Sequence, residues 1–311
     1  MRNRSTTSEY TASRGSLRAS VKGKFIEEML DPCIVGMVRQ VVLDFRRLVD
    51  DSLHYATGFV LEDAGRKLRI DIEVDSELPV CVEQFVGNNV PGDFQIKDGR
   101  FRVVDMQAEL FAGLRDHISK PAARRQERDW QDIADWLRNT HFENMLAEFS
   151  SDVLGEYDSR HQPRPRIHLH ALVIGLVSQA LELSVNHVSL ITLIHEYAHA
   201  YTHLGKDVDD NAWSLEGYEN LDVTVKEAVA QFYTAYLCNE LDKVNPGLKV
   251  AFDRLTSMQN SMYRQYQLWP CQGRHIGECV RIGIIKARKE RISSESEFEA
   301  CLNDAVRLIG R

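Results

Sequence analysis

The sequence has no apolar run long enough to cross a membrane and no excess of positive charge. A spanning helix needs roughly 18 consecutive apolar residues, and no stretch of the chain reaches that length, so we expect no membrane partner. The net charge of the 311 residues is −8, which argues against a body that binds nucleic acid. With 43% hydrophobic and 27% charged residues, the composition is that of a globular chain with one large or two modest domains.

Cysteine is scarce and scattered, with six residues in the whole chain and no C-x2-C pair. This usage does not suit a disulfide framework, so we expect free thiols and a reducing, cytoplasmic compartment. Cys271, His275 and Cys279 form one cluster of metal-ligand types, but three residues are one ligand short of a structural zinc site. We therefore expect free thiols there and no second metal.

The first residues lack the apolar segment that a secretory signal peptide carries. Residues 1–23 are instead basic and rich in serine and threonine. This composition predicts a disordered tail. The two alternatives are an address for specialised export and an arm that contacts an acidic partner.

Two regions with different patterns follow the tail. Residues 24–160 predict a mixed α/β region, and residues 161–311 predict a mainly helical one, with the break at Pro163 and Pro165. Just after the break, residues 167–184 fit either a strand followed by a helix or a helix throughout. The combined prediction is an α+β fold.

Within the first region, the periodicity predicts strands between residues 57 and 104. Hairpin turns are expected at 64–65 and 98–99. Helices are expected on either side of the strands, at about 24–55 and at 105–157.

The most informative stretch is the pentapeptide HEYAH at 195–199, within an apolar run at 189–204. On a helix, two histidines four residues apart project from one face and can hold one metal ion. Glu196 lies about 100° round the helix, close enough to reach a water on that ion. Zinc suits imidazole ligands, and a catalytic zinc keeps one position for water and lowers its pKa toward about 7.

The setting of the pentapeptide is that of a half-buried helix. Neither glycine nor proline interrupts the apolar run before Gly205, so we expect the helix to end at Leu204, with Asn186 or Ser189 as its N-cap. Burying two histidines and a glutamate without a shared partner would be costly. A metal site is therefore favoured over an amphipathic helix with two surface histidines.

A catalytic zinc needs a third protein ligand, and Glu227 is the leading candidate. It follows His199 by 28 residues in a second helical pattern, which leaves room for a loop and an antiparallel return. The alternative is a capping box, in which Glu227 folds back onto the Thr224 amide. The main rival ligand, His203, lies about 12 Å from His195 along the helix axis, too far to share one ion easily. Spare carboxylates in the intervening loop are Asp207, Asp209 and Glu216.

HEYAH followed by EAVAQ at 227–231 resembles the gluzincin group of zinc metallopeptidases. The resemblance covers about residues 188–236 and implies a zincin-like domain with a small sheet over the HExxH helix and a helical C-terminal part. It also implies Glu196 as the general base, one zinc ion per chain and a protein or peptide as substrate. The implied zinc ligands are His195, His199 and Glu227. Thermolysin-like members carry an aspartate four residues after the ligand glutamate, where this chain has Gln231, whose amide can still accept a hydrogen bond from an imidazole.

Several donors near the motif are equivalent candidates for stabilising an oxyanion. They are Tyr201, His203, Tyr218, Tyr233 and Tyr236. The function expected from these residues is a zinc-dependent metallopeptidase. Two alternatives stay open, namely a non-proteolytic zinc-bound regulator and a zinc hydrolase of a non-peptide amide or ester. Glu196 argues against the regulator, because a structural zinc site needs four ligands and no base.

Overall fold

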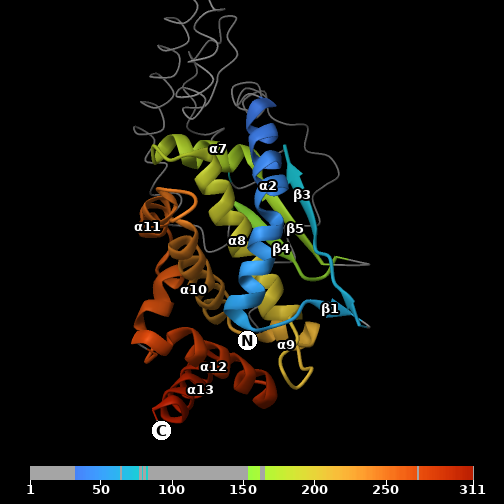
Figure 1. The fold of residues 1–311 in the computed structure, drawn as a ribbon, viewed down its shortest axis with the longest axis vertical. Coiled ribbons are helices and arrows are strands. Elements are labelled where there is room, and N and C mark those ends of the chain that lie inside the picture. The colour runs from blue at the N-terminus through green and yellow to red at the C-terminus, as the bar shows by residue number, and fades with distance from the viewer. Residues whose placement is uncertain are drawn as a thin grey trace, which may run out of the picture.

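The computed structural model describes the chain from residue 32 onward, except for a long stretch before residue 153 and a few shorter ones. The described residues are 32–63, 65–76, 79, 82, 153–161, 165–271 and 273–310. The tail expected at 1–23, the hairpin at 98–99 and the helices expected from 105 to 152 lie outside them. The described part is mixed α+β and mostly helical, as Figure 1 shows.

The elements follow one another along the chain, with η marking a 3-10 helix. In order they are α2 (Pro32–Thr57), β1 (Glu62–Asp63), β2 (Arg66–Lys67), β3 (Asp71–Asp75), β4 (Gly155–Asp158), β5 (Arg166–His170), α7 (Ala171–Ala180), α8 (Val185–Leu204), α9 (Leu215–Asn220), α10 (Val223–Leu241), α11 (Leu248–Met258), η3 (Ser261–Leu268), η4 (Gly273–His275), α12 (Ile276–Glu290) and α13 (Glu295–Ile309).

Helix α8, which carries HEYAH, is the central element of the fold. Helix α2 packs along one side of it, α10 along another, and strands β4 and β5 against a third (Figure 1). Nearly every residue of α8 is buried. Such all-round burial is what a helix without a continuous polar face requires.

The ends of α8 differ in detail from the expectation. The helix starts at Val185, earlier than predicted, because the hydroxyl of Ser184 caps it by accepting a hydrogen bond from the backbone N–H of His187 at 3.4 Å. It ends at Leu204 as predicted. Gly205 is extended rather than left-handed, and a Cβ there would lie 2.4 Å from the carbonyl oxygen of Tyr201, so close packing explains this glycine.

A three-stranded sheet with the order β3-β5-β4 flanks α8. Strand β5 pairs with β3 in parallel and with β4 in antiparallel orientation. The alternation of a strand places Ile167 and Leu169 in the core and turns His168 and His170 to the other face. Of the two alternatives for this segment, the strand followed by a helix is confirmed.

Strand β4 lies where the sequence predicted a helix, which was expected to extend to residue 157. That prediction is wrong for residues 155–157. Residues 155–158 are extended because they pair with β5, a non-local contact that overrides local preference. The expected hairpin around 64–65 is present as the antiparallel pair of β1 and β2, and β3 follows it as a further strand.

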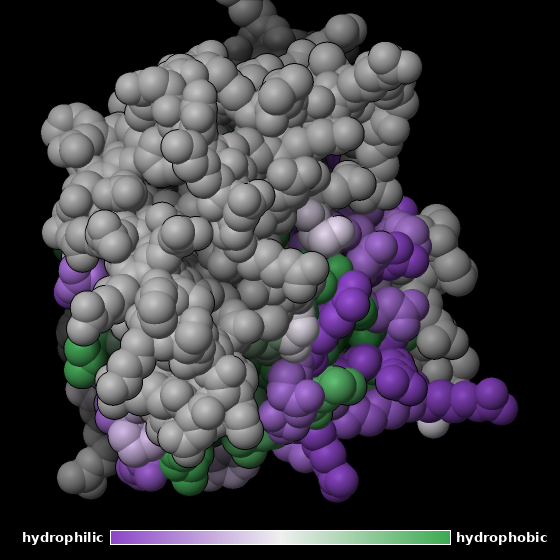
Figure 2. Space-filling view, turned by 90° about the horizontal axis from the view of Figure 1, so that it is seen from above, coloured by the Kyte–Doolittle hydropathy of each residue, from purple (hydrophilic) through white to green (hydrophobic). Residues whose placement is uncertain are grey.

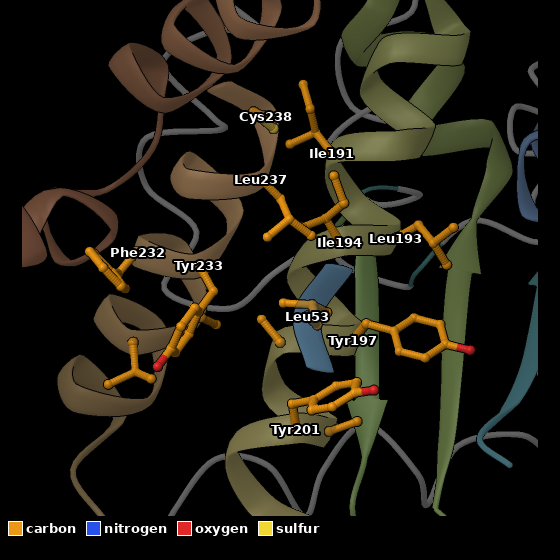
Figure 3. Close-up of a cluster of buried hydrophobic side chains, with 14 of the residues drawn as sticks. Leu53, Ile191, Leu193, Ile194, Tyr197, Tyr201, Phe232, Tyr233, Leu237 and Cys238 are labelled. Carbon is orange, nitrogen blue, oxygen red and sulfur yellow. The ribbon is translucent and has the colours of Figure 1, made fainter. Parts of the chain in front are cut away.

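One hydrophobic core joins elements on both sides of position 160, from Ile34 of α2 to Ala305 of α13. In Figure 3, Ile194 of α8 lies against Leu237 of α10, and Leu53 of α2 lies close to them. The core therefore fixes α2, α8 and α10 relative to one another.

The cysteines before and within α12 also differ from the prediction. Cys271 and Cys279 form a disulfide that links the segment after η3 to α12, so the expectation of free thiols at these two positions is wrong. Cys238 and Cys301 are free and buried.

The described helices include none that combines the length and apolarity of a membrane span. Seen from above, the described surface visible in Figure 2 is mainly hydrophilic, with small hydrophobic spots between the polar side chains.

Candidate metal centre

Three predicted ligands from two helices meet beside α8. The Nε2 atoms of His195 and His199 lie 3.1 Å apart. The Oε2 atom of Glu227, on α10, lies 3.2 Å from His195 Nε2 and 3.4 Å from His199 Nε2. Both histidines are buried, and Glu227 is partly buried. The antiparallel return that the sequence predicted thus brings the three donor atoms together.

These distances fit one tetrahedral ion. Zinc binds nitrogen and oxygen ligands at about 2.0–2.1 Å, and a tetrahedron with such bonds has edges of about 3.3–3.4 Å between ligand atoms. The three observed separations of 3.1, 3.2 and 3.4 Å lie close to that value. Two imidazoles and one carboxylate are also a donor set that zinc accepts in catalytic sites.

Glu227 is not a capping residue. Helix α10 begins at Val223, and its N-cap is Asp222, whose carboxylate accepts a hydrogen bond from the Thr224 N–H at 2.8 Å. Glu227 therefore lies beyond the position of a capping-box glutamate. Burial raises the pKa of Glu227, but His199 and His195 together hold it well below its usual range.

The outer nitrogens of both histidines also have partners. The Nδ1 atom of His199 lies 3.0 Å from the Tyr218 hydroxyl, and Nδ1 of His195 lies 3.5 Å from Oγ1 of Thr234. The Thr234 hydroxyl already donates its hydrogen to the Ala230 carbonyl at 2.8 Å, so toward His195 it can only accept. This arrangement favours a proton on Nδ1 of His195 and leaves Nε2 to bind a metal.

Glu196 lies in the tight contact between α8 and the sheet. Its side chain is 1% exposed. A Cβ added to Gly155 of β4 would lie 3.0 Å from Cγ and Oε1 of Glu196 and 2.8 Å from Cγ2 of Thr192. Only glycine lets β4 approach the helix this closely, so the strand holds the side chain of Glu196 in place.

An aromatic cluster covers the end of the site toward the C-terminus of α8. The hydroxyl of Tyr157, on β4, lies 2.9 Å from Nδ1 of His203, and its ring is parallel to that of His199 with centroids 6.5 Å apart. The ring of Tyr218 stacks on His203 at 4.4 Å. Burial, together with Arg288, lowers the pKa of His203 to about 4, so its ring is neutral at pH 7.

Tyr218 and Glu196 are also electrostatic neighbours. Burial first, then Tyr157, Glu227 and Glu196, raises the pKa of Tyr218 well above its ordinary value. The Tyr218 phenol therefore stays protonated and uncharged next to the two carboxylates.

Two other predicted residues, Tyr201 and Gln231, have their polar groups engaged elsewhere, and the hydroxyl of a third, Tyr233, is buried without a hydrogen-bond partner among the described residues. The hydroxyl of Tyr201 contacts Asp50 of α2, at 2.6 Å from its Oδ1, and in Figure 3 Tyr201 projects from α8 toward the sheet side, away from α10. Gln231 donates to Thr256 of α11 at 2.9 Å. Burial raises the pKa of the Tyr233 hydroxyl, and the charged groups that act on it are arginines of α12.

The spare carboxylates also lie apart from the three ligands. The side chain of Asp207 accepts hydrogen bonds from the backbone of its own loop. Asp209 pairs with Lys289 of α12, and Glu216 is exposed on α9. Glu227 is therefore the carboxylate that the fold brings to the histidines within the described residues.

Three residues around the ligands were not predicted from the sequence, namely Gly155, Tyr157 and Thr234. Thr234 could have been found, because it follows Glu227 by seven residues and so lies on the same face of α10 two turns later. No local signal could have found the other two, since their stretch was expected to be helical.

A second group of potential ligands lies on the outer face of the sheet. Glu73, Asp75 and His168 approach one another across β3 and β5. However, Arg166 donates to Glu73 at 2.6 Å, and Asp75 is the first cause of a raised pKa of His168. These ion pairs already balance the charges of the group, so it suits a metal less well than the triad on α8 and α10.

Comparison of the chain with protein families, curated proteins and solved structures finds no match. The function is therefore inferred from the geometry of the site.

Proposed function

We propose that the chain is a zinc-dependent metallopeptidase that resembles the gluzincins, with a zincin-like arrangement of HExxH helix and small sheet. The observation that carries the proposal is the spacing of the donor atoms of His195, His199 and Glu227, which matches the edges of a zinc tetrahedron. Three protein ligands leave a fourth position for water. A buried glutamate next to the first ligand is the base that a structural site would not need.

The roles of the residues follow from this arrangement. Zinc, when bound by the three ligands, supplies a Lewis acid that polarises a carbonyl group and makes water easier to deprotonate. Glu196 accepts a proton from the attacking water and delivers it to the nitrogen of the leaving amine. Its contact with Gly155 limits the positions that the carboxylate can take. This restriction favours transfer of the proton along the same path in every turnover.

The hydrogen-bonded pair of Tyr157 and His203 is our choice for the oxyanion donor. Tyr201 donates to Asp50, and the Tyr218 hydroxyl meets Nδ1 of His199, on the side of the ring away from the Nε2 that faces the other two ligands. The hydroxyl of Tyr157 belongs to the aromatic cluster beside His199 and can rotate from His203 toward a substrate oxygen.

The position of β4 favours a peptide over a small amide or ester. Among the described strands, β4 is at an edge of the sheet, and it packs directly on α8 at Glu196. The backbone groups of an edge strand can pair with an extended peptide. A peptide paired in this way would run alongside the HEYAH helix.

The proposal is tested with a library of synthetic peptides and detection of cleavage by mass spectrometry. Glu196→Gln keeps the size of the side chain and removes the basic oxygen, so cleavage should fall by a factor of about 10² or more, with zinc content and Tm unchanged. The matched control is Glu216→Gln, on an exposed glutamate of α9, and it should cleave like wild type.

Two results would contradict the proposal. Undiminished cleavage by Glu196→Gln would remove Glu196 as the base. A zinc-loaded wild type that hydrolyses small esters or amides but no peptide would instead support the non-peptide hydrolase.

A further inference from the structure

Tyr218 connects the metal ligand His199 to a helix outside the HEYAH segment. Its hydroxyl lies 3.0 Å from Nδ1 of His199, and both side chains are buried. The other nitrogen of His199, Nε2, is the one that faces His195 and Glu227. The two nitrogens of this ring therefore have separate tasks.

The proton of the ring decides whether His199 can bind a metal. Nε2 can give its lone pair to an ion only when the proton of the neutral ring is on Nδ1. A buried N–H needs an acceptor, and the hydroxyl oxygen of Tyr218 is in place to accept it. The same hydrogen bond fixes the rotation of the ring about its bond to the helix.

Tyr218 is itself held firmly. Its ring stacks on His203 with 11° between the planes, and Nζ of Lys226 lies 5.5 Å from its centroid. Its backbone N–H donates to the Ser214 carbonyl at 2.9 Å, and the Ser214 hydroxyl caps α9. A side chain held at its ring and at its backbone can impose a position on its partner.

We propose that Tyr218 is the positioning residue for the ligand His199, an inference that rests on the proposed zinc site. The sequence suggested Gln231 as the hydrogen-bond partner of a ligand imidazole, but its amide donates to Thr256. Tyr218 acts on the metal through His199 and without touching the ion. Partners of this kind around ligand histidines change metal affinity about 10–100-fold when removed.

The test compares two tyrosine-to-phenylalanine variants of the full chain. Tyr218→Phe removes the acceptor of His199. Tyr233→Phe is the matched control, because Tyr233 is equally buried and its hydroxyl has no hydrogen-bond partner among the described residues. Zinc affinity is measured by competition with a chromogenic chelator, and Tm is measured on the metal-free proteins.

We expect Tyr218→Phe to weaken zinc binding about 10–100-fold, while Tyr233→Phe binds zinc like wild type. A purely structural role of Tyr218 would lower Tm without this selective loss of zinc affinity. Equal zinc affinity in the two variants would overturn the inference. If wild type bound no zinc, the proposed function itself would fail, so the two failures are distinguishable.

A measurement on wild type keeps the inference testable should Tyr218→Phe not fold. Nitrogen-15 labelling of histidine shows by NMR which ring nitrogen carries the proton in the zinc-loaded protein. We expect His199 to carry it on Nδ1, in a slowly exchanging hydrogen bond. A proton on Nε2, or a freely exchanging one on Nδ1, would contradict the role of Tyr218.

Discussion

Glu227 is a carboxylate that burial alone would not keep charged. Burial raises its pKa, and the two histidines more than offset that effect, so the pKa of Glu227 lies well below its usual range. The negative charge is therefore present where a dication would be bound. Its nearest rival in the sequence, His203, is engaged with Tyr157 and Tyr218 instead.

Replacing Glu227 and His203 in turn shows which of the two is the third zinc ligand. Glu227→Ala should lower zinc affinity strongly, because two protein ligands rarely hold zinc tightly, whereas His203→Ala should leave it nearly intact. Titration of both variants against a chelator measures the difference. Wild-type affinity in Glu227→Ala would show that this carboxylate is not a ligand.

His203 should make the stability of the protein depend on pH. Burial and Arg288 lower its pKa to about 4 in the folded state, against about 6.5 in the unfolded chain. As the pH falls through this window, the unfolded chain takes up a proton that the folded chain does not, so stability is lost. The difference in pKa corresponds to about 3 kcal/mol.

The pH effect is measured by urea denaturation of the metal-free protein at about pH 7 and about pH 4. Wild type should lose about 3 kcal/mol more over this interval than His203→Gln, which has no titrating ring at that position. The other titrating groups are common to both proteins and cancel in the comparison. Parallel losses in the two proteins would contradict a buried neutral His203.

At the scale of elements, the contact between β4 and α8 is the one that reaches the proposed base. Gly155 permits it, because any larger residue would meet Thr192 and Glu196. Gly155→Ala should therefore displace Glu196, and a displacement of about 1 Å can cost up to about 10² in rate. Zinc content should stay at the wild-type level, because the atoms nearest to an added Cβ at Gly155 belong to Thr192 and Glu196 and to none of the three ligands.

Gly36→Ala is the control for Gly155→Ala. An added Cβ at Gly36 meets nothing within 4 Å, and alanine within α2 should stabilise the protein by about 0.5–1 kcal/mol. Peptide cleavage and zinc content of both variants are measured together. Full activity in Gly155→Ala would show that β4 does not position Glu196.

The sequence predicted the elements whose signals are local. The HEYAH helix, its end at Leu204 and the return through Glu227 all follow from periodicity and spacing. Strand β4 could not be predicted in this way, because its extension depends on pairing with β5. Tyr157, which reaches the site from that strand, was missed for the same reason.

The disulfide shows a different limit. Cys271 and Cys279 are eight residues apart, and no spacing rule distinguishes a linked pair from two thiols in a helical region. Their approach depends on how the segment after η3 meets α12. Similarly, the hydrogen bond of Tyr218 to His199 depends on the path of the loop that leads to α9.

At the scale of the whole molecule, the C-terminal helices support the segment that carries Tyr218. Arg288 of α12 donates to the carbonyl oxygens of Thr202 at 2.7 Å and Asn211 at 3.2 Å. Its guanidinium lies 3.9 Å from the Asp207 carboxylate, with both side chains almost fully buried. Burial lowers the pKa of Arg288 to about 10, so it stays charged at pH 7.

Removing Arg288 should destabilise the fold strongly. Arg288→Met leaves Asp207 buried without its counter-charge, and breaking such a pair costs about 3–5 kcal/mol. Adding Asp207→Asn should restore part of the loss, because the lone charge is then gone. Chemical denaturation of the single and double variants gives the free energies of unfolding, and a loss below about 1 kcal/mol would mean that the pair is not a structural link.

The most direct test of the account is the zinc content of the purified chain, determined by elemental mass spectrometry. Wild type should carry one zinc ion per chain, and the double variant His195→Ala, His199→Ala should carry close to none. The double variant His161→Ala, His275→Ala, in which both histidines lie outside the triad, should keep the wild-type content. Full zinc occupancy without His195 and His199, or a wild type that takes up no zinc when zinc is supplied, would contradict the metal centre.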